Sequence, residues 1–350
     1  MKLKQLLTGI TSGLLFYVLV QVPVFATVPP DAPKDIKYIL GFYYGNGENI
    51  LIRENMGQLE LVYRLSVEDR CFKNANIFPL AKEHFDSYTM NEAGPLNHTE
   101  TAVKFERDTD GYGITCRIGG HAYSRGFLGN NQGEKEKTFR LPPLPEAKWQ
   151  ELREKAAAAA MPKVLAQGKQ VELVAASSIP GIKIISVYGT QDNFFGAPLY
   201  KDENLWLGSE AAEALKKVQQ DLARFGYGLV LWDAYRPWSV SKLAHLALPE
   251  NNKGMLDNPD TKGSPHNTGN AVDVGLYSLE TGEELEMISG FDEPSFRQYA
   301  AYTGGTSRQR YQRELLREIM ELNGFTGSEI EWWHFDFDKK GSYAHLNIEP

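Results

Sequence analysis

One segment divides the chain into two parts of different composition. The stretch "LPPLPEAKWQELREKAAAAAMP", residues 141–162, opens with closely spaced prolines and continues as an Ala, Glu, Lys and Arg run that ends at Pro162. Prolines stiffen a chain and the following run has high helix propensity, so we expect a Pro-rich and then helical linker. Because 350 residues are many for one hydrophobic core, the linker predicts two domains, over residues 34–140 and 163–350.

The part before the linker has the pattern of short strands joined by turns. "YILGFYY" is followed by the turn "GNGEN", and "AVKFERD" and "GITCRIGG" flank the turn "TDG". Residues 34–140 have no helical periodicity and therefore predict a small all-β domain, a barrel or a sandwich. Its histidines are interpreted as surface or core residues rather than metal ligands: His84, His98 and His121.

The first 26 residues have the pattern of a secretory signal peptide. Two lysines in "MKLK" precede an apolar run, and "VFA" before Thr27 supplies a cleavage site after Ala26. An uncleaved anchor is the alternative, since the run approaches the about 20 residues that cross a bilayer. Pro23 and the Ala26 site are unusual in a retained span, so we expect cleavage and export, to the periplasm or the medium, with no membrane span left.

Export bears on the two cysteines of the chain. Outside the reducing cytosol, Cys71 and Cys116 could form a disulfide, whose closed loop would contribute about 4 kcal/mol of stability in the chain-entropy model. Two buried free thiols are an equal alternative. The sequence leaves the two states open.

The part after the linker mixes helices and strands. Apolar residues three or four apart predict helices over residues 209–226 and 307–324, each ending near a glycine. "YGLVLWDAY" after the first helix and "IEWWHFDF" near the end of the chain predict strands. Without regular alternation of strand and helix, residues 163–350 predict an α+β domain.

Three segments of this domain carry reactive side chains. They are "WDAYRPWSVSKLAH" (232–245), "SPHNTGNAVDVGLY" (264–277) and "EWWHFDF" (331–337). A catalytic zinc takes three protein ligands and leaves one position for water or substrate. Two imidazoles and one carboxylate suit zinc better than magnesium or calcium, which prefer oxygen ligands. We therefore predict one zinc ion held by His266, Asp273 and His334.

Two further residues have the chemistry of catalytic groups. Glu331 would be the general base that takes a proton from the attacking water. Arg236, fixed by the following Pro237, would stabilise the oxyanion that forms at the scissile carbonyl. Residues three apart on a regular strand face opposite sides, so Glu331 and His334 can share a site only where the strand bulges or ends. We predict such an irregularity.

The order of these motifs resembles a known enzyme family. "YRP", then "SPHNTGNAVD" in a Ser-x-His-x-x-Gly-x-Ala-x-Asp pattern, then "EWWH", together with "DNFFGAPLY" and "FDEPS", look like the zinc D-alanyl-D-alanine dipeptidases of the vancomycin-resistance type. The resemblance spans about residues 182–337 and places the chain in the wider D-Ala-D-Ala metallopeptidase and hedgehog-like group. It implies an antiparallel sheet with flanking helices.

The resemblance also implies roles for single residues. Carried over position by position, it puts zinc on the three predicted ligands, makes Glu331 the base and Arg236 the carbonyl polariser, and suggests that Ser264 and Asp292 hold the ends of the dipeptide. Asp292 would pair with the free ammonium of the substrate; a helix N-cap is the alternative for it. The N-terminal part loosely resembles the small lipocalin-like barrels appended to β-lactamase-like peptidases.

Three functions are compatible with these residues. The first is hydrolysis of D-Ala-D-Ala in cell-wall turnover or glycopeptide tolerance. The second is a D,D- or L,D-carboxypeptidase acting on peptidoglycan stem peptides, which an open cleft around Asp292 would favour. The third is a non-catalytic zinc-binding wall protein, against which Glu331 and Arg236 argue because metal binding requires neither. A net charge of -8 disfavours nucleic acid as a partner. The oligomeric state is left open.

Overall fold

A computed structural model describes residues 27–63, 76–90, 101–126, 139–200 and 204–349. The expected signal peptide, Cys71 and His98 lie outside these residues. Cys116 is buried in the core of the N-terminal domain. Because its candidate partner Cys71 is outside the described residues, the pairing of the two cysteines stays open. Within the described residues no helix has both the length and the apolar composition needed to cross a membrane.

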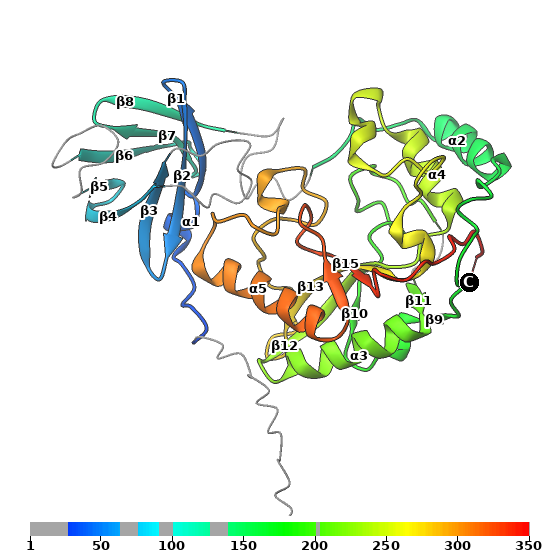
Figure 1. The fold of residues 1–350 in the computed structure, drawn as a ribbon. Coiled ribbons are helices and arrows are strands. Elements are labelled where there is room, and N and C mark those ends of the chain that lie inside the picture. The colour runs from blue at the N-terminus through cyan, green and yellow to red at the C-terminus, as the bar shows by residue number, and fades with distance from the viewer. Residues whose placement is uncertain (1–26, 64–75, 91–100, 127–138, 201–203, 350) are drawn as a thin grey trace, which may run out of the picture.

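The N-terminal part forms a closed barrel, on the left in Figure 1. After a short helix α1 (Lys34–Lys37), each strand pairs antiparallel with the next, and β8 returns to β1. The strands are β1 (Gly41–Gly45), β2 (Glu48–Asn55), β3 (Gln58–Tyr63), β4 (Asn76–His84), β5 (Ser87–Met90), β6 (Thr101–Arg107), β7 (Gly113–Ile118) and β8 (His121–Arg125). The predicted all-β domain is therefore a barrel and not a sandwich.

Turn chemistry and core packing explain this barrel. The first two hairpins turn at Asn46-Gly47 and Met56-Gly57, where both residues have positive φ, as the tight turns between antiparallel strands require. Every second residue along a strand faces the inside of the barrel, and these residues form its apolar core. Among them are Tyr43, Ile50 and Leu61. The buried guanidinium of Arg125 donates hydrogen bonds to the carbonyls of Tyr38 and Leu40, which ties the last strand to the chain before β1. His84 and His121 are exposed.

The second part is built on a five-stranded sheet in the order β10-β12-β13-β15-β14. Its strands are β10 (Lys183–Ile184), β12 (Tyr227–Asp233), β13 (Ala271–Ser278), β14 (Phe325–Gly327) and β15 (His334–Phe337). All pairs are antiparallel except β10 with β12. A separate pair joins β9 (Leu173–Ala175) to β11 (Trp206–Gly208). This is the α+β fold that the sequence predicts.

Helices cover the sheet and close its ends. The amphipathic helices α3 (Ser209–Ala223) and α5 (Ser307–Leu322) lie side by side and share one core with the sheet (Figure 1). Helix α4 (Trp238–Ala247) follows β12. The second domain also contains short 3-10 helices, which are η2 (Ala176–Ser178), η3 (Glu250–Met255), η4 (Pro265–Thr268) and η5 (Phe296–Gln298).

The expected linker is helical where its composition predicts a helix. Helix α2 spans Glu146–Ala158 and follows Pro145. Its buried residues Trp149 and Leu152 pack in one cluster with Leu243 and Leu248, in and just after α4. The helical part of this segment is thus packed onto the second domain, because its apolar face finds a partner there.

The hairpin of β2 and β3 makes one of the contacts between the barrel and the second domain. Leu51 and Val62 belong to the core cluster of the second domain. The carboxylate of Glu54, only 1% exposed, accepts hydrogen bonds from the backbone N–H and the hydroxyl of Ser307, the first residue of α5. The hairpin therefore supplies the acidic group that stabilises the positive end of this helix.

Candidate active site

His266 is held by a short capped helix. It lies on η4, whose N-cap Ser264 accepts a hydrogen bond from the His266 N–H at 3.3 Å, while the Asn267 side chain accepts one from the Ser264 N–H. The Nδ1 atom of His266 lies 2.7 Å from the carbonyl oxygen of Ala234. A carbonyl can only accept, so Nδ1 carries a proton and Nε2 is the ring nitrogen that faces the cluster.

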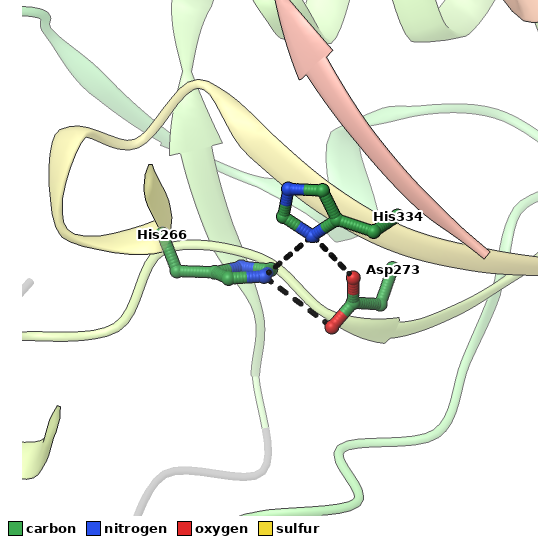
Figure 2. Close-up of side chains that lie close together, drawn as sticks. All are labelled: His266, Asp273 and His334. Carbon is green, nitrogen blue, oxygen red and sulfur yellow. Dashed lines mark hydrogen bonds and ion pairs between the residues drawn. The ribbon is translucent and has the colours of Figure 1, made fainter. Parts of the chain in front are cut away.

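Asp273 and His334 meet His266 because their strands pair in register. Asp273 on β13 lies directly opposite His334 on β15. His334 Nδ1 is 3.0 Å from Asp273 Oδ1 and 3.2 Å from His266 Nε2, and His266 Nε2 is 3.3 Å from Asp273 Oδ2 (Figure 2). One ligand atom from each residue lies within 4.8 Å of the other two. The structure thus brings together the three side chains that the sequence predicts as ligands.

The charges of this cluster favour a cation at its centre. Burial disfavours a charged Asp273, but His266 and His334 hold its pKa well below the ordinary value. Burial likewise opposes a charged His334, but Asp273, Asp336 and Glu331 raise the pKa of His334 to about 10. The neighbouring carboxylates therefore favour a positive charge at this position. A metal ion would compete with the proton that supplies this charge on His334. Two imidazoles and a carboxylate that converge in this way fit zinc.

Glu331 reaches the cluster through an irregular backbone. Strand β15 begins only at His334, and the His334 N–H donates to the Glu331 carbonyl at 3.3 Å, which closes a turn over the preceding residues. The predicted irregularity is confirmed. Burial raises the pKa of Glu331, although His334 and His266 oppose the rise. A carboxylate with a raised pKa is a better proton acceptor than an exposed one.

Arg236 is buried beside the cluster and fixed from two sides. Its guanidinium pairs with Asp233, with Nε 3.1 Å from Oδ2, and lies 4.7 Å above the ring of Tyr188. Its backbone N–H donates to the carbonyl of His266, and its carbonyl accepts from Asn267. The backbone of Arg236 is therefore tied to η4.

Asp292 lies between this cluster and a cleft. Its φ of 56° is in the left-handed region, its Oδ2 accepts a hydrogen bond from Tyr188 Oη at 2.5 Å, and burial raises its pKa well above the ordinary value. Asp273, Glu331 and Arg236 act on its charge, which places it near them. Asp292 is not a helix N-cap, because Ser295 caps η5. The hydroxyl of Ser264 caps η4.

Sequence reasoning missed three groups that hold the site. They are the Ala234 carbonyl on His266, the Tyr188 hydroxyl on Asp292, and Asp336, whose Oδ1 lies 3.3 Å from His334 Nε2. The period of a strand could have indicated Asp336, because residues two apart share a face. Among the described residues, no other group of His, Cys, Asp and Glu side chains has the geometry of a metal site.

Comparisons with known proteins show which family the second domain is similar to. The model of the D-Ala-D-Ala dipeptidase family of peptidases (M15) matches residues 169–348. A D-alanyl-D-alanine dipeptidase of Enterococcus faecium is 37% identical over 174 residues, which cover 45% of this chain and 86% of the relative. A D-alanyl-D-alanine dipeptidase of Escherichia coli K12 is 35% identical over 167 residues, which cover 48% of this chain and 84% of the relative.

A solved structure of an LD-carboxypeptidase covers 40% of this chain and 60% of that one, at 21% identity and a TM-score of 0.27. A likeness of this degree carries no weight here. The barrel lies outside the matched residues 169–348. By the family match and by its relatives, this chain belongs to the D-Ala-D-Ala dipeptidase family of metallopeptidases.

Proposed function

We propose that the chain is a zinc-dependent D-Ala-D-Ala dipeptidase that takes part in cell-wall peptide turnover or glycopeptide tolerance. The observation that carries the proposal is the convergence of His266, Asp273 and His334, with one atom of each within 4.8 Å of the others. Glu331 is joined to His334 by the hydrogen bond from the His334 N–H to the Glu331 carbonyl, and the Arg236 N–H donates to the His266 carbonyl. A metal-binding module without catalysis would need neither residue.

Each residue has a role that its surroundings support. When bound, zinc acts as a Lewis acid and lowers the pKa of water to about 7. Glu331 accepts the proton of the attacking water and returns it to the leaving amine. Arg236, held by Asp233, donates to the oxygen of the scissile carbonyl as negative charge develops on it. Asp292 pairs with the ammonium of the first residue.

Product analysis tests this proposal directly. Metal-free protein is incubated with D-Ala-D-Ala or L-Ala-L-Ala, with and without one equivalent of zinc, and free alanine is measured. We expect release of D-alanine from the D,D-dipeptide only with zinc. Zinc-loaded protein that hydrolyses neither dipeptide, nor any longer peptide ending in D-Ala-D-Ala, would remove the proposal.

A second candidate function is a carboxypeptidase acting on peptidoglycan stem peptides. The observation that favours it is the cleft of about 410 Å³ that Asp292 lines. Cleavage of the stem pentapeptide in the same assay, without cleavage of the dipeptide, would make this the main activity.

We also propose that the protein is exported, to the periplasm or the medium. The support is the signal-peptide pattern of residues 1–26, which ends at Ala26. N-terminal sequencing of the protein recovered from envelope and culture fractions tests it. A mature chain that starts at Thr27 is the expected result, and an intact Met1 in the cell pellet contradicts it.

A further inference from the structure

Glu331 lies on a turn whose backbone is held by a neighbouring segment on both sides of this residue. The Trp332 N–H donates a hydrogen bond to the carbonyl of Gln298 at 2.8 Å. The Glu329 carbonyl accepts one from the Ala300 N–H at 3.2 Å. Because Glu331 lies between the two bonded residues of the turn, the neighbouring segment fixes the point from which its side chain extends.

The same segment is held by the barrel. Residues 296–305, which we call the bracing segment, contact the barrel at both ends. The ring centroid of Phe42 on β1 lies 5.6 Å from that of Phe296 and 5.8 Å from that of Tyr302. The carbonyl of Gly305 accepts a hydrogen bond from a backbone N–H of β2 at 3.1 Å. The bracing segment therefore lies between the barrel and the turn that carries the proposed base.

Phe42 faces the second domain because side chains alternate along β1. Its neighbour Tyr43 belongs to the barrel core, so Phe42 points out of the barrel. Across the sheet Phe42 is paired with Leu51, and Leu51 with Val62. Leu51 and Val62 are buried in the core cluster of the second domain, and Phe42 packs against that cluster. The outer face of the barrel thus presents an apolar row to the second domain, and Phe42 of this row contacts the bracing segment.

The metal ligands are held by other contacts. His334 lies on β15, directly opposite Asp273 of β13. His266 is fixed on η4 by the Ala234 carbonyl. These contacts do not pass through the bracing segment. A displacement of the segment would therefore shift Glu331 relative to a metal site that the sheet and η4 keep in place.

We propose that the barrel positions the catalytic base, and that Phe42 is the positioning residue through which it acts. Its contacts with Phe296 and Tyr302 hold the bracing segment, and the segment holds the backbone on both sides of Glu331. A general base must lie within hydrogen-bond reach of the proton it accepts. A displacement of about 1 Å can lower turnover by about 100-fold. The inference rests on the proposed function, since it takes Glu331 as the base.

Hydrogen–deuterium exchange tests the link between the barrel and the turn without an assay of activity. Phe42→Ala removes the ring that holds the bracing segment. The amides of Trp332 and Ala300 should then exchange about tenfold faster, because the hydrogen bonds that protect them open more often. The amides of β12, in the second domain's sheet, should keep their wild-type rates. Mass spectrometry of peptides that cover these residues measures both.

Kinetics of the zinc-loaded full-length protein test the consequence for catalysis. We expect Phe42→Ala to lower kcat for D-Ala-D-Ala by about 10- to 100-fold. KM and zinc affinity should stay within about twofold of wild type, because the base acts in the transition state and the metal ligands are held elsewhere. Phe42→Leu, which keeps an apolar side chain against Phe296, should recover most of kcat.

Phe78→Ala is the matched control. Phe78 is also half-buried on a barrel strand, but it packs against the barrel core. Both substitutions remove one half-buried ring from the barrel, so they should lower the free energy of unfolding by similar amounts. Only Phe42→Ala should change kcat and the exchange rate of the Trp332 amide. A general loss of barrel stability would affect both variants alike.

Two results would overturn the inference. Equal kcat in Phe42→Ala and Phe78→Ala, with unchanged exchange at Trp332, shows that the second domain positions Glu331 by itself. A fall in zinc affinity that matches the fall in kcat shows that Phe42 acts on the metal site and not on the base.

The design also covers a variant that does not fold and a protein that is inactive. Phe42→Val has a side chain that suits a strand and is shorter than that of Phe. It replaces Phe42→Ala if that variant does not fold, with the same expected results. If the wild-type protein hydrolyses no peptide, the proposed function fails. The exchange rate at Trp332 then still decides whether the barrel holds the turn, and an unchanged rate overturns that too.

Discussion

Both histidines of the cluster have a partner for the ring nitrogen that faces away from it. The Ala234 carbonyl holds His266 Nδ1, and Asp336 holds His334 Nε2. Such partners fix the tautomer and the ring orientation of a metal ligand. Asp336 is a positioning residue in this sense, because it acts on the metal site only through His334.

Replacing Asp336 should weaken metal binding more than it affects the fold. We expect Asp336→Asn to lower zinc affinity by about 10- to 100-fold, measured by competition with a chromogenic chelator. The control is Asp338→Asn, an exposed residue on the same segment, which should leave the affinity unchanged. Equal affinities for both variants would show that His334 is oriented without Asp336.

Glu331 can be separated from metal binding because it is not one of the three converging ligands. Glu331→Gln keeps the size of the side chain and removes the basic oxygen. Since general bases contribute about 10²- to 10⁴-fold, kcat for D-Ala-D-Ala should fall by that factor. Zinc content, measured by atomic absorption, should stay at one per chain. Retained activity would remove the base assignment, and loss of zinc would make Glu331 part of the metal site.

At the scale of single elements, η4 connects Ser264 to the metal site. Ser264 and Asn267 form a reciprocal cap on this helix, which carries His266 between them. Loss of an N-cap costs about 1 kcal/mol. We expect Ser264→Ala to lower the free energy of unfolding by this amount and Ser264→Asn, which can still cap, to restore most of it, as urea denaturation would measure.

The same pair of variants tests the substrate-binding role expected for Ser264. If the hydroxyl contacts the dipeptide, KM for D-Ala-D-Ala rises in both variants, including the one that keeps the cap. If Ser264 acts only through η4, KM and zinc affinity change in Ser264→Ala and recover in Ser264→Asn. A stable Ser264→Ala protein with unchanged affinity would remove both roles.

Local chemistry made much of the fold and the site predictable. The hairpin at Asn46-Gly47, the helices over 209–226 and 307–324, and the break before His334 follow from turn residues, periodicity and the faces of a strand. The candidate ligands were identified because the motif fixes their types and order. These features depend on residues close together in the sequence.

Contacts between distant segments were not predictable in this way. A register shift between Leu231 and Asp233 brings Asp233 opposite Asp273, and no local signal marks it. The cleft wall combines Arg140, from the end of the first part, with Glu284 and Asp292. The packing of α2 on α4 likewise depends on which apolar face lies nearby, and periodicity does not specify a partner.

At the scale of the whole molecule, the barrel and the second domain share a continuous apolar interface. Phe42 on β1 has its ring centroid 5.6 Å from that of Phe296 and 5.8 Å from that of Tyr302. Arg310 of α5 donates to the Glu54 carbonyl, and the Glu54 N–H donates to the Gly305 carbonyl. These hydrogen bonds and the apolar contact together join the barrel to the second domain.

Glu54 makes a buried polar contact across this interface. Its buried carboxylate satisfies the Ser307 N–H at 2.7 Å and compensates the positive end of α5. Glu54→Ala would leave buried donors without an acceptor, which costs about 1–3 kcal/mol. We therefore expect a lower free energy of unfolding in urea, by that amount, and wild-type zinc affinity, because no metal ligand contacts Glu54.

The matched control is Glu106→Ala on the outer face of the barrel. Glu106 pairs with Arg117, and both side chains are 48% exposed, so solvent screens the pair and its loss should lower the stability much less than the loss of Glu54 does. A Glu54→Ala protein as stable as the Glu106→Ala protein would show that the apolar contact alone joins the two domains. A wild-type protein that unfolds in two separate transitions, with the barrel first, would show that the interface does not couple the domains, since coupled domains lose their shared contacts in one step.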